Sequence, residues 1–265
     1  MKMTEPSIYD LMTKYSRDLK LDFDGKELAA FALENKYTDS QLKAVIGLLK
    51  CIDEKKHTTA INTLLRLSRL PRKVPKTFES YDFSRIHGKD VGALKALSSL
   101  AEVNAGKNIA LIGPPGVGKT HLAQAYGRAC CLNGMKTYFL KASELREKFN
   151  TARRFGREER IVATLVKPTC LIIDEVGRCT FDKENTTLFF DLVDRRYSKE
   201  GPQTIIFTSN KQPSSWGDYF TGKDDLLAAL DRIFDDASVF NIKGTSYRGR
   251  ECHTYAVEAG EMVAE

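Results

Sequence analysis

The octapeptide GPPGVGKT, residues 113–120, constrains the fold more than any other part of this 265-residue chain. It matches the pattern G-x-x-x-x-G-K-[ST] and lies between an apolar run, IALI, and a helix-like segment, THLAQAYGRA. Its glycines let backbone N–H groups converge, and the following helix adds the positive end of its dipole. The motif therefore predicts a loop for the phosphates of ATP, with Lys119 on the β- and γ-phosphates and Thr120 on Mg²⁺. The predicted nucleotide contacts are Gly113, Pro114, Pro115, Gly116, Val117, Gly118, Lys119, Thr120 and His121.

Two further apolar runs end in polar residues that suit hydrolysis. In CLIIDEVG, a predicted strand ends in Asp174 and Glu175. Asp174 is predicted to hold Mg²⁺, and Glu175 is predicted to be the general base for the attacking water. TIIFTSN ends at Asn210, whose amide is predicted to orient that water. A kinase does not need the second acid, so the pair favours a hydrolase. A scaffold that binds nucleotide without turnover and a small-molecule kinase are the alternatives that Glu175 argues against.

From about residue 78 onward, short apolar runs alternate with helical patterns. This alternation predicts an α/β core with a five-stranded parallel sheet and helices on both faces. The expected strands are 109–112, 137–140, 170–173, 204–207 and 239–242, and the expected helices are 90–104, 119–132, 143–165, 185–198 and 224–234.

The first 70 residues show apolar positions only at helical spacing. Asp24 with Glu27, and Thr38 with Gln41, have the spacing of capping boxes that open two helices. Two prolines then interrupt a basic segment, RLPRKVPKTF. We expect a small all-helical N-terminal domain for DNA or a partner at 1–70, a basic linker at 71–83 and an ATPase domain at 84–265.

The positive charge is concentrated near the N-terminus. Residues 1–76 hold 15 Lys and Arg against 10 Asp and Glu, which gives +5 of the net +6, and no acid occurs between Glu54 and Glu79. This asymmetry fits a polyanionic partner such as nucleic acid, and it fits a solvated basic linker equally well.

Membrane and secretory classes are not indicated. No run of 18 apolar residues occurs, and the charged N-terminus does not resemble a signal peptide. The six cysteines form no C-x-x-C pair. We expect a cytoplasmic protein with reduced cysteines and no membrane partner.

Taken in order, GPPGVGKTHLA, LIIDEVG and TSN resemble the DnaC/IstB branch of the AAA+ ATPases. The segment LPRKVPKTFESYDF resembles the joining segment of IstB proteins, and ALDRIF with VFNIKGTSYRGRE resembles the end of that family. The resemblance implies an AAA+ P-loop ATPase core. Only 23 residues follow Ile242 (265 − 242), so no C-terminal helical lid is expected.

The same resemblance implies two arginines that act on nucleotide. Arg232, in LDRIF, matches an arginine finger that reaches the γ-phosphate of a neighbouring subunit. Arg248, in TSYRGR, resembles a second arginine that contacts the nucleotide. The alternative for Arg232 is an exposed helix residue paired with Asp235 or Asp236.

The resemblance also implies DNA contact. Relatives carry an additional helix in the region that corresponds to 142–166, where basic residues follow nucleic-acid phosphates. Here TARRFGREER supplies Arg153, Arg154 and Arg157, and Lys141 precedes the region. The alternative is a solvated helix face that Glu158 and Glu159 balance.

The expected function follows from the resemblance to IstB proteins. It is an ATP hydrolase that forms an ATP-dependent homo-oligomer on double-stranded DNA and assists the IstA-like transposase of an insertion sequence. The alternative is a DnaC-like loader of a replicative helicase, which would share the same ATPase core.

Overall fold

The computed structural model describes residues 6–221, 223–244 and 246, and the chain divides after Leu64 into two compact units. The first unit contains α1 (Ile8–Leu19), α2 (Gly25–Glu34) and most of α3 (Asp39–Leu67). Their inward faces form a small core of Met12, Tyr15, Leu28, Ala32, Leu42 and Ile46. The prediction that this region is helical is confirmed.

Capping boxes begin the helices of the first unit. The Asp24 carboxylate accepts hydrogen bonds from two N–H groups of the first turn of α2, and the Glu27 carboxylate accepts one from the Asp24 N–H at 2.6 Å. Thr38 and Gln41 form the same reciprocal pair before α3. These side chains satisfy N–H groups that a helix start otherwise leaves without partners.

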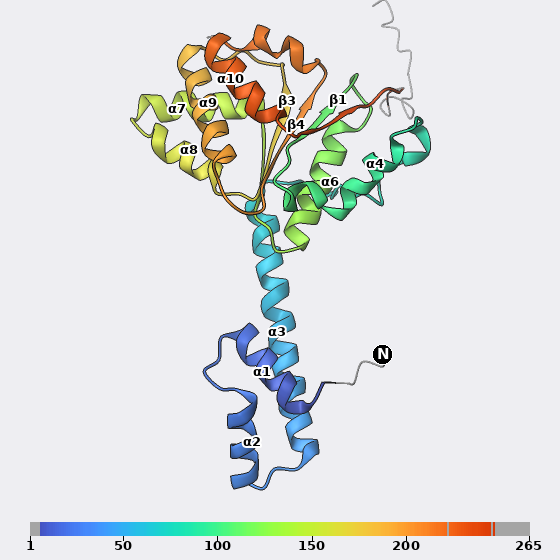
Figure 1. Ribbon diagram of the computed structural model, residues 1–265, viewed down its shortest axis with the longest axis vertical. Coiled ribbons are helices and arrows are strands. Elements are labelled where there is room, and N and C mark those ends of the chain that lie inside the picture. The colour runs from blue at the N-terminus through green and yellow to red at the C-terminus, as the bar shows by residue number, and fades with distance from the viewer. Residues whose placement is uncertain (1–5, 222, 245, 247–265) are drawn as a thin grey trace, which may run out of the picture. The chain divides into compact units, whose positions relative to one another are not determined.

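The second unit is built on a five-stranded sheet in the order β2-β3-β4-β1-β5. Figure 1 labels its three central strands, β3, β4 and β1. Every neighbouring pair is parallel. The strands are β1 (Ile109–Ile112), β2 (Thr137–Lys141), β3 (Cys170–Val176), β4 (Thr204–Ser209) and β5 (Ser238–Asn241). The predicted α/β sheet is confirmed. Strands β2, β3 and β4 continue beyond their predicted ends, and β5 begins and ends one residue earlier than predicted.

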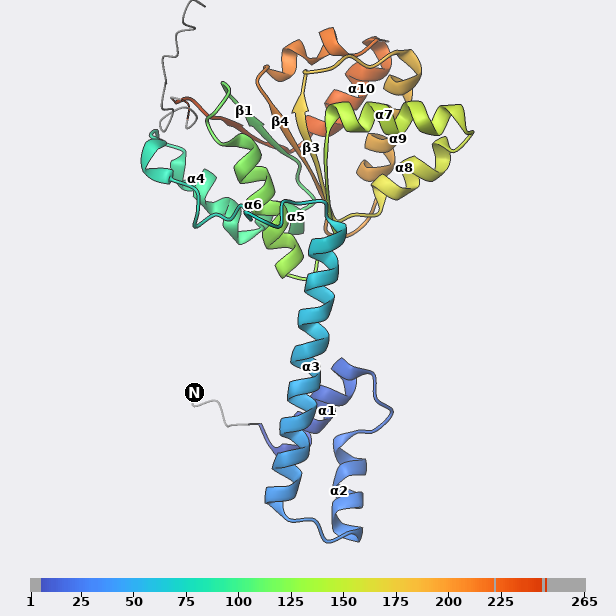
Figure 2. The same cartoon turned by 180° about the vertical axis from the view of Figure 1, so that it is seen from behind.

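Helices cover both faces of this sheet (Figures 1 and 2). One face is covered by α6 (Lys119–Leu132), and the other by α7 (Ala142–Arg154) and α9 (Lys183–Tyr197). Next to α9 lie α8 (Glu158–Val166) and α10 (Lys223–Phe234). The shorter elements are η1 (Phe83–Arg85), α4 (Val91–Ala96), η2 (Leu97–Ser99), α5 (Ala101–Asn104) and η3 (Pro213–Tyr219).

Two helices that the sequence predicted as continuous are broken. The stretch 90–104 is interrupted at Leu100, and the stretch 143–165 is interrupted around Gly156; both residues have a left-handed backbone with φ of 60°. A single left-handed residue ends a helix because it turns the chain out of the helical path. The second break converts the predicted helix into the α7–α8 hairpin.

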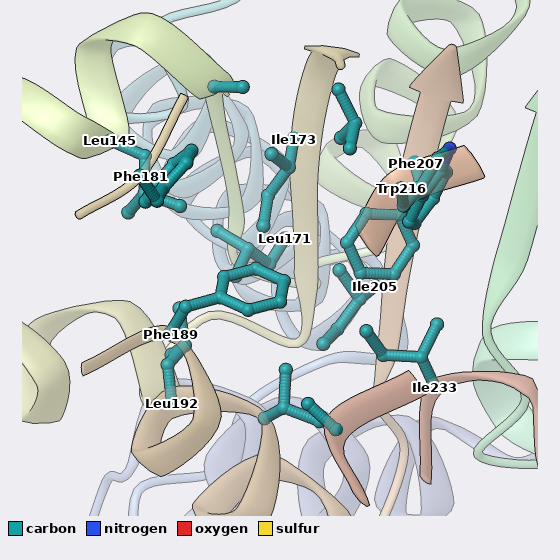
Figure 3. Packing of buried hydrophobic residues seen from close by; sticks show 14 of the residues in the cluster. Leu145, Leu171, Ile173, Phe181, Phe189, Leu192, Ile205, Phe207, Trp216 and Ile233 are labelled. Carbon is teal, nitrogen blue, oxygen red and sulfur yellow. The ribbon is translucent and has the colours of Figure 1, made fainter. Parts of the chain in front are cut away.

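Successive side chains of a strand point to opposite faces of the sheet, which determines which residues of β3 and β4 enter the core. Leu171 and Ile173 of β3, with Ile205 and Phe207 of β4, point into the cluster beneath α7 and α9 (Figure 3). Ile172 points the opposite way, where its Cδ1 lies against Gly127 of α6. Because side chains alternate along a strand, Asp174 falls on the α6 face at the carboxyl end of β3.

Among the described helices, none is both long and apolar enough to cross a bilayer. The predicted lack of a helical lid concerns residues after β5, nearly all of which lie outside the described ranges.

Candidate nucleotide site

The loop between β1 and α6 lies at the carboxyl edge of the sheet. The Gly113 N–H donates to the Ser209 carbonyl at 3.1 Å, which ties the loop to the end of β4. The Lys119 side chain is buried, and its ammonium donates to the carbonyls of Gly113 and Pro114, both at 2.8 Å. Because α6 begins at Lys119, its positive dipole end and this ammonium act at the same place.

Tyr81, whose role no sequence motif predicts, packs against this loop. Its side chain is buried, and its hydroxyl donates to the Val117 carbonyl at 2.9 Å. Its ring lies so close to Gly118, which has φ of 86°, that a Cβ at this position would overlap the ring. Beside it, His121 contacts the Thr77 carbonyl, and burial lowers the pKa of its imidazole. No motif predicts an aromatic residue 36 positions before Val117 that contacts the phosphate loop. The one signal in the sequence is that Tyr81 belongs to FESYDF, within the segment that resembles IstB proteins.

The two residues predicted to bind Mg²⁺ are brought together. The Thr120 hydroxyl donates to Asp174 Oδ1 at 2.8 Å, and the Thr208 hydroxyl donates to the same oxygen. Burial raises the pKa of the Asp174 carboxyl, and the two hydroxyl donors act against that rise. Mg²⁺ prefers few hard oxygen ligands together with water and phosphate oxygens, so this pair fits it. Within the described residues, no group of three or more His, Cys, Asp and Glu forms another candidate metal site.

Thr208 was also missed from sequence, although strand alternation could have placed it on the α6 face with Asp174. Thr208→Val should lower the affinity for Mg²⁺ in nucleotide binding by roughly 10- to 100-fold, the usual effect of removing a group that orients a metal ligand. It would remove the donor to Asp174 and the acceptor of the Glu175 N–H, 3.0 Å away. A Mg²⁺ titration of ATP-analogue binding measures the effect. Thr208→Ser keeps the hydroxyl and is the control, and an unchanged midpoint in the valine variant would refute the role.

Glu175 lies at an irregularity of β3. Its φ is 62°, and the β3–β4 register shifts between Ile173 and Val176. Such a bulge redirects one side chain without ending the strand. The Glu175 side chain is 29% exposed, and its carboxylate forms ion pairs with Lys141, at 3.1 Å, and with Arg178.

These ion pairs determine the charge of Glu175. Burial alone would raise the pKa of its carboxyl, but Lys141 and Arg178 outweigh burial and hold the pKa below its ordinary value. The carboxylate is therefore ionised at neutral pH, as a general base must be. Lys141, predicted to contact DNA, lies at the end of β2 beside this carboxylate rather than on the α7–α8 hairpin; the order of strands, not the local sequence, brings the two together.

The other predicted catalytic residues are placed as follows. Asn210 directly follows β4 and is exposed at the same sheet edge as Glu175. Arg232 lies on α10, where its guanidinium pairs with Asp194 at 3.1 Å instead of Asp235 or Asp236, and contacts the ring of Phe190. Arg248 falls outside the described residues.

The predicted DNA-contacting arginines differ in their surroundings. Arg153 is paired with Asp182 at 2.9 Å and with Glu184 at 3.5 Å. Arg154 and Arg157 are exposed, and neither forms an ion pair with any residue that the structure describes. DNA contact stays a prediction for all three, and the geometry favours the latter two.

The order β2-β3-β4-β1-β5, with the phosphate loop after β1 and an Asp-Glu pair at the carboxyl end of β3, defines an AAA+ P-loop ATP-binding protein. The chain belongs to the IstB family, since the model of the IstB-like ATP binding protein matches residues 19–254.

Curated relatives agree with the family. An ATP-binding protein of insertion sequence IS5376 from Geobacillus stearothermophilus is 38% identical over 204 residues, 77% of this chain and 79% of that protein. An ATP-binding protein of insertion sequence IS21 from Pseudomonas aeruginosa is 38% identical over 196 residues, which are 74% of this chain and 72% of that protein.

Solved structures agree with the fold. The chain resembles DnaI with a TM-score of 0.54 at 20% identity, covering 68% of this chain and 95% of DnaI. It resembles AMPPCP-bound DnaA from Aquifex aeolicus with a TM-score of 0.53 at 21% identity, covering 66% of this chain and 51% of that one.

Proposed function

We propose that this protein hydrolyses ATP, assembles as an oligomer on duplex DNA and assists the transposase of an insertion sequence. The observation that carries the proposal is the contact between Thr120 and Asp174 beside the ionised Glu175, at the mouth of the phosphate loop. Support for the biological role comes from the relatives, which are ATP-binding proteins of insertion sequences.

The residues of the site divide the work of hydrolysis. Lys119 binds the phosphates, while Thr120 and Asp174 would hold Mg²⁺, which would neutralise phosphate charge when bound. Glu175 accepts the proton of the attacking water, and Asn210 orients that water. Glu175 must first release Lys141 and Arg178, which now hold its carboxylate.

Oligomerisation supplies the remaining cation. Arg232 belongs to α10, which packs on α9 on the sheet face opposite α6. By the resemblance to the family, it acts on the phosphates of a neighbouring subunit, after its pair with Asp194 is broken. Contacts of this kind repeat head to tail, and they generate a ring or a helical filament.

DNA binding rests on charge. The segment from Lys55 to Phe78 has seven Lys and Arg and no acid, and the α7–α8 hairpin adds exposed arginines. Duplex DNA carries a negative charge per about 1.7 Å of its axis, which rewards extended runs of cations.

A competition titration at fixed salt, with a non-hydrolysable ATP analogue, tests the DNA part of the proposal. Duplex DNA should compete at least as well as a single strand of equal length, and the complex should size as larger than a dimer. A clear preference for single strands, together with a stable complex with the replicative helicase, would instead identify a helicase loader.

A further inference from the structure

The tip of the α7–α8 hairpin exposes an aromatic ring. Phe155 directly follows α7 and is 65% exposed, while Phe149 and Ala152 of the same helix are buried. The Arg157 N–H donates to the Ala152 carbonyl and the Gly156 N–H to the Arg153 carbonyl, which is the Schellman arrangement that ends a helix. Gly156 has φ of 60°. The turn therefore fixes Phe155 at the outer end of the hairpin, away from the core.

The base of the hairpin is held firmly. The guanidinium of Arg196, on α9, is buried and donates to the carbonyls of Leu165 and Val166 in the last turn of α8. At the other end of α8, next to the tip, Arg195 forms a bidentate pair with Glu159 at 2.6 and 2.7 Å. Figure 2 shows α8 lying beside α9. A fixed base lets the tip present its side chains without losing much conformational freedom on binding.

The charges around Phe155 are mostly positive. Arg195 neutralises Glu159, and Arg146 pairs with Glu147. Of the hairpin's remaining charged groups in the described structure, Glu158 is the one acid without an ion pair, against four such cations: Lys148, Arg154, Arg157 and Arg160.

The ring borders a hollow that combines apolar and basic walls. The hollow has a volume of about 410 Å³ and lies between α7 and α8, where Phe155 and Ile161 line it together with Lys148, Arg157 and Arg160. One acid, Glu147, also lines it and is paired with Arg146. The Arg157 guanidinium lies 5.7 Å from the centre of the Phe155 ring. Phosphates attract such cations, and the flat apolar faces of bases accept such a ring, so nucleic acid complements both features.

We propose that Phe155 contacts the bases of duplex DNA as an apolar wedge at a base step, while the surrounding cations hold the adjacent phosphates. Side chains of this kind partly unstack a base step when cations anchor the backbone on either side. This inference rests on the proposed function, because it requires the protein to bind duplex DNA. The contact between the Phe155 ring and the bases is apolar. Added salt therefore does not weaken it, whereas salt does weaken the contacts between the cations and the phosphates.

The test compares Phe155→Ala with Phe155→Trp in the full chain, with an ATP analogue and a duplex that contains 2-aminopurine. Phe155→Ala should weaken duplex binding roughly 5- to 150-fold, the scale for losing one aromatic contact with a base. The slope of log K against log[salt] should stay the same, since no phosphate contact is lost. The rise in 2-aminopurine fluorescence that reports unstacking should vanish in the alanine variant and return with tryptophan.

Leu132→Ala provides the matched control, because Leu132 is 46% exposed at the end of α6, across the sheet from the hairpin. It should bind duplex like the unaltered chain. ATP-analogue binding checks that each variant is folded. If the unaltered chain binds no duplex, the proposed function fails; if it binds and Phe155→Ala binds equally well, the wedge alone is refuted. A loss in Phe155→Ala that comes with a changed salt slope would also refute the wedge.

Discussion

Glu175→Gln should retain ATP binding and lose turnover by about 10²–10⁴-fold, the scale of a general base. The amide has nearly the same shape as the carboxylate but accepts no proton from water at neutral pH. Nucleotide affinity should change little, because Lys119, Thr120 and Asp174 are untouched. Single-turnover hydrolysis and analogue binding, measured on the same preparation, separate the two effects.

Glu144→Gln is the control for that variant, since Glu144 is also held by a cation, Arg69 at 3.0 Å, but lies on α7. Its turnover should match that of the unaltered chain. Hydrolysis by Glu175→Gln at the unaltered rate would show that another group activates the water.

Arg232→Ala should bind ATP normally and hydrolyse it about 10³–10⁵-fold more slowly, the range attributed to arginine fingers. In the described structure Arg232 pairs with Asp194 and lies over the ring of Phe190, so its removal also loses a packing contact, and ATP-analogue binding checks that the variant is folded. Steady-state hydrolysis above the assembly concentration measures the effect. Arg128→Ala, which removes an arginine of α6 that forms no ion pair within the described residues, is the control and should hydrolyse ATP at a near-normal rate.

Mixing distinguishes action in trans from action within one chain. Arg232→Ala retains a complete phosphate loop, and Lys119→Ala retains the finger. Random mixing in equal amounts should create active interfaces at roughly a quarter of the head-to-tail positions, so that activity returns although each variant is inactive alone. If the mixture stays inactive, or if Arg232→Ala is fully active by itself, the trans assignment is wrong.

Local sequence predicted the parts of the fold that local chemistry determines. The phosphate loop, the five strands and the capping boxes at Asp24 and Thr38 are set by residues within a few positions of one another. The Thr120–Asp174 contact was also predictable, because both motifs occur at the carboxyl ends of parallel strands.

Contacts that depend on the strand order were not predictable in this way. Lys141 reaches Glu175 because β2 lies next to β3, and Arg232 reaches Asp194 because α10 packs on α9. Tyr81 contacts the phosphate loop from 36 positions away along the chain. The break at Gly156 was missed because a single glycine within a helical pattern does not by itself indicate a turn.

The ion pairs of Glu175 and Arg232 suggest how DNA and hydrolysis are linked. In the single chain each of these catalytic groups is held by a partner inside its own subunit. Assembly on DNA would supply the neighbour whose phosphates attract Arg232 away from Asp194. Hydrolysis should then require assembly, and duplex DNA should promote both.

The most direct test of this account is the rate of ATP hydrolysis measured as duplex DNA is added at a fixed, low protein concentration. We predict that duplex stimulates turnover of the unaltered chain and leaves Glu175→Gln at its low basal rate. Stimulation should appear over the same range of DNA concentration as assemblies larger than a dimer. A rate that is independent of both duplex DNA and protein concentration would contradict the account, because it would mean that one chain completes the active site alone.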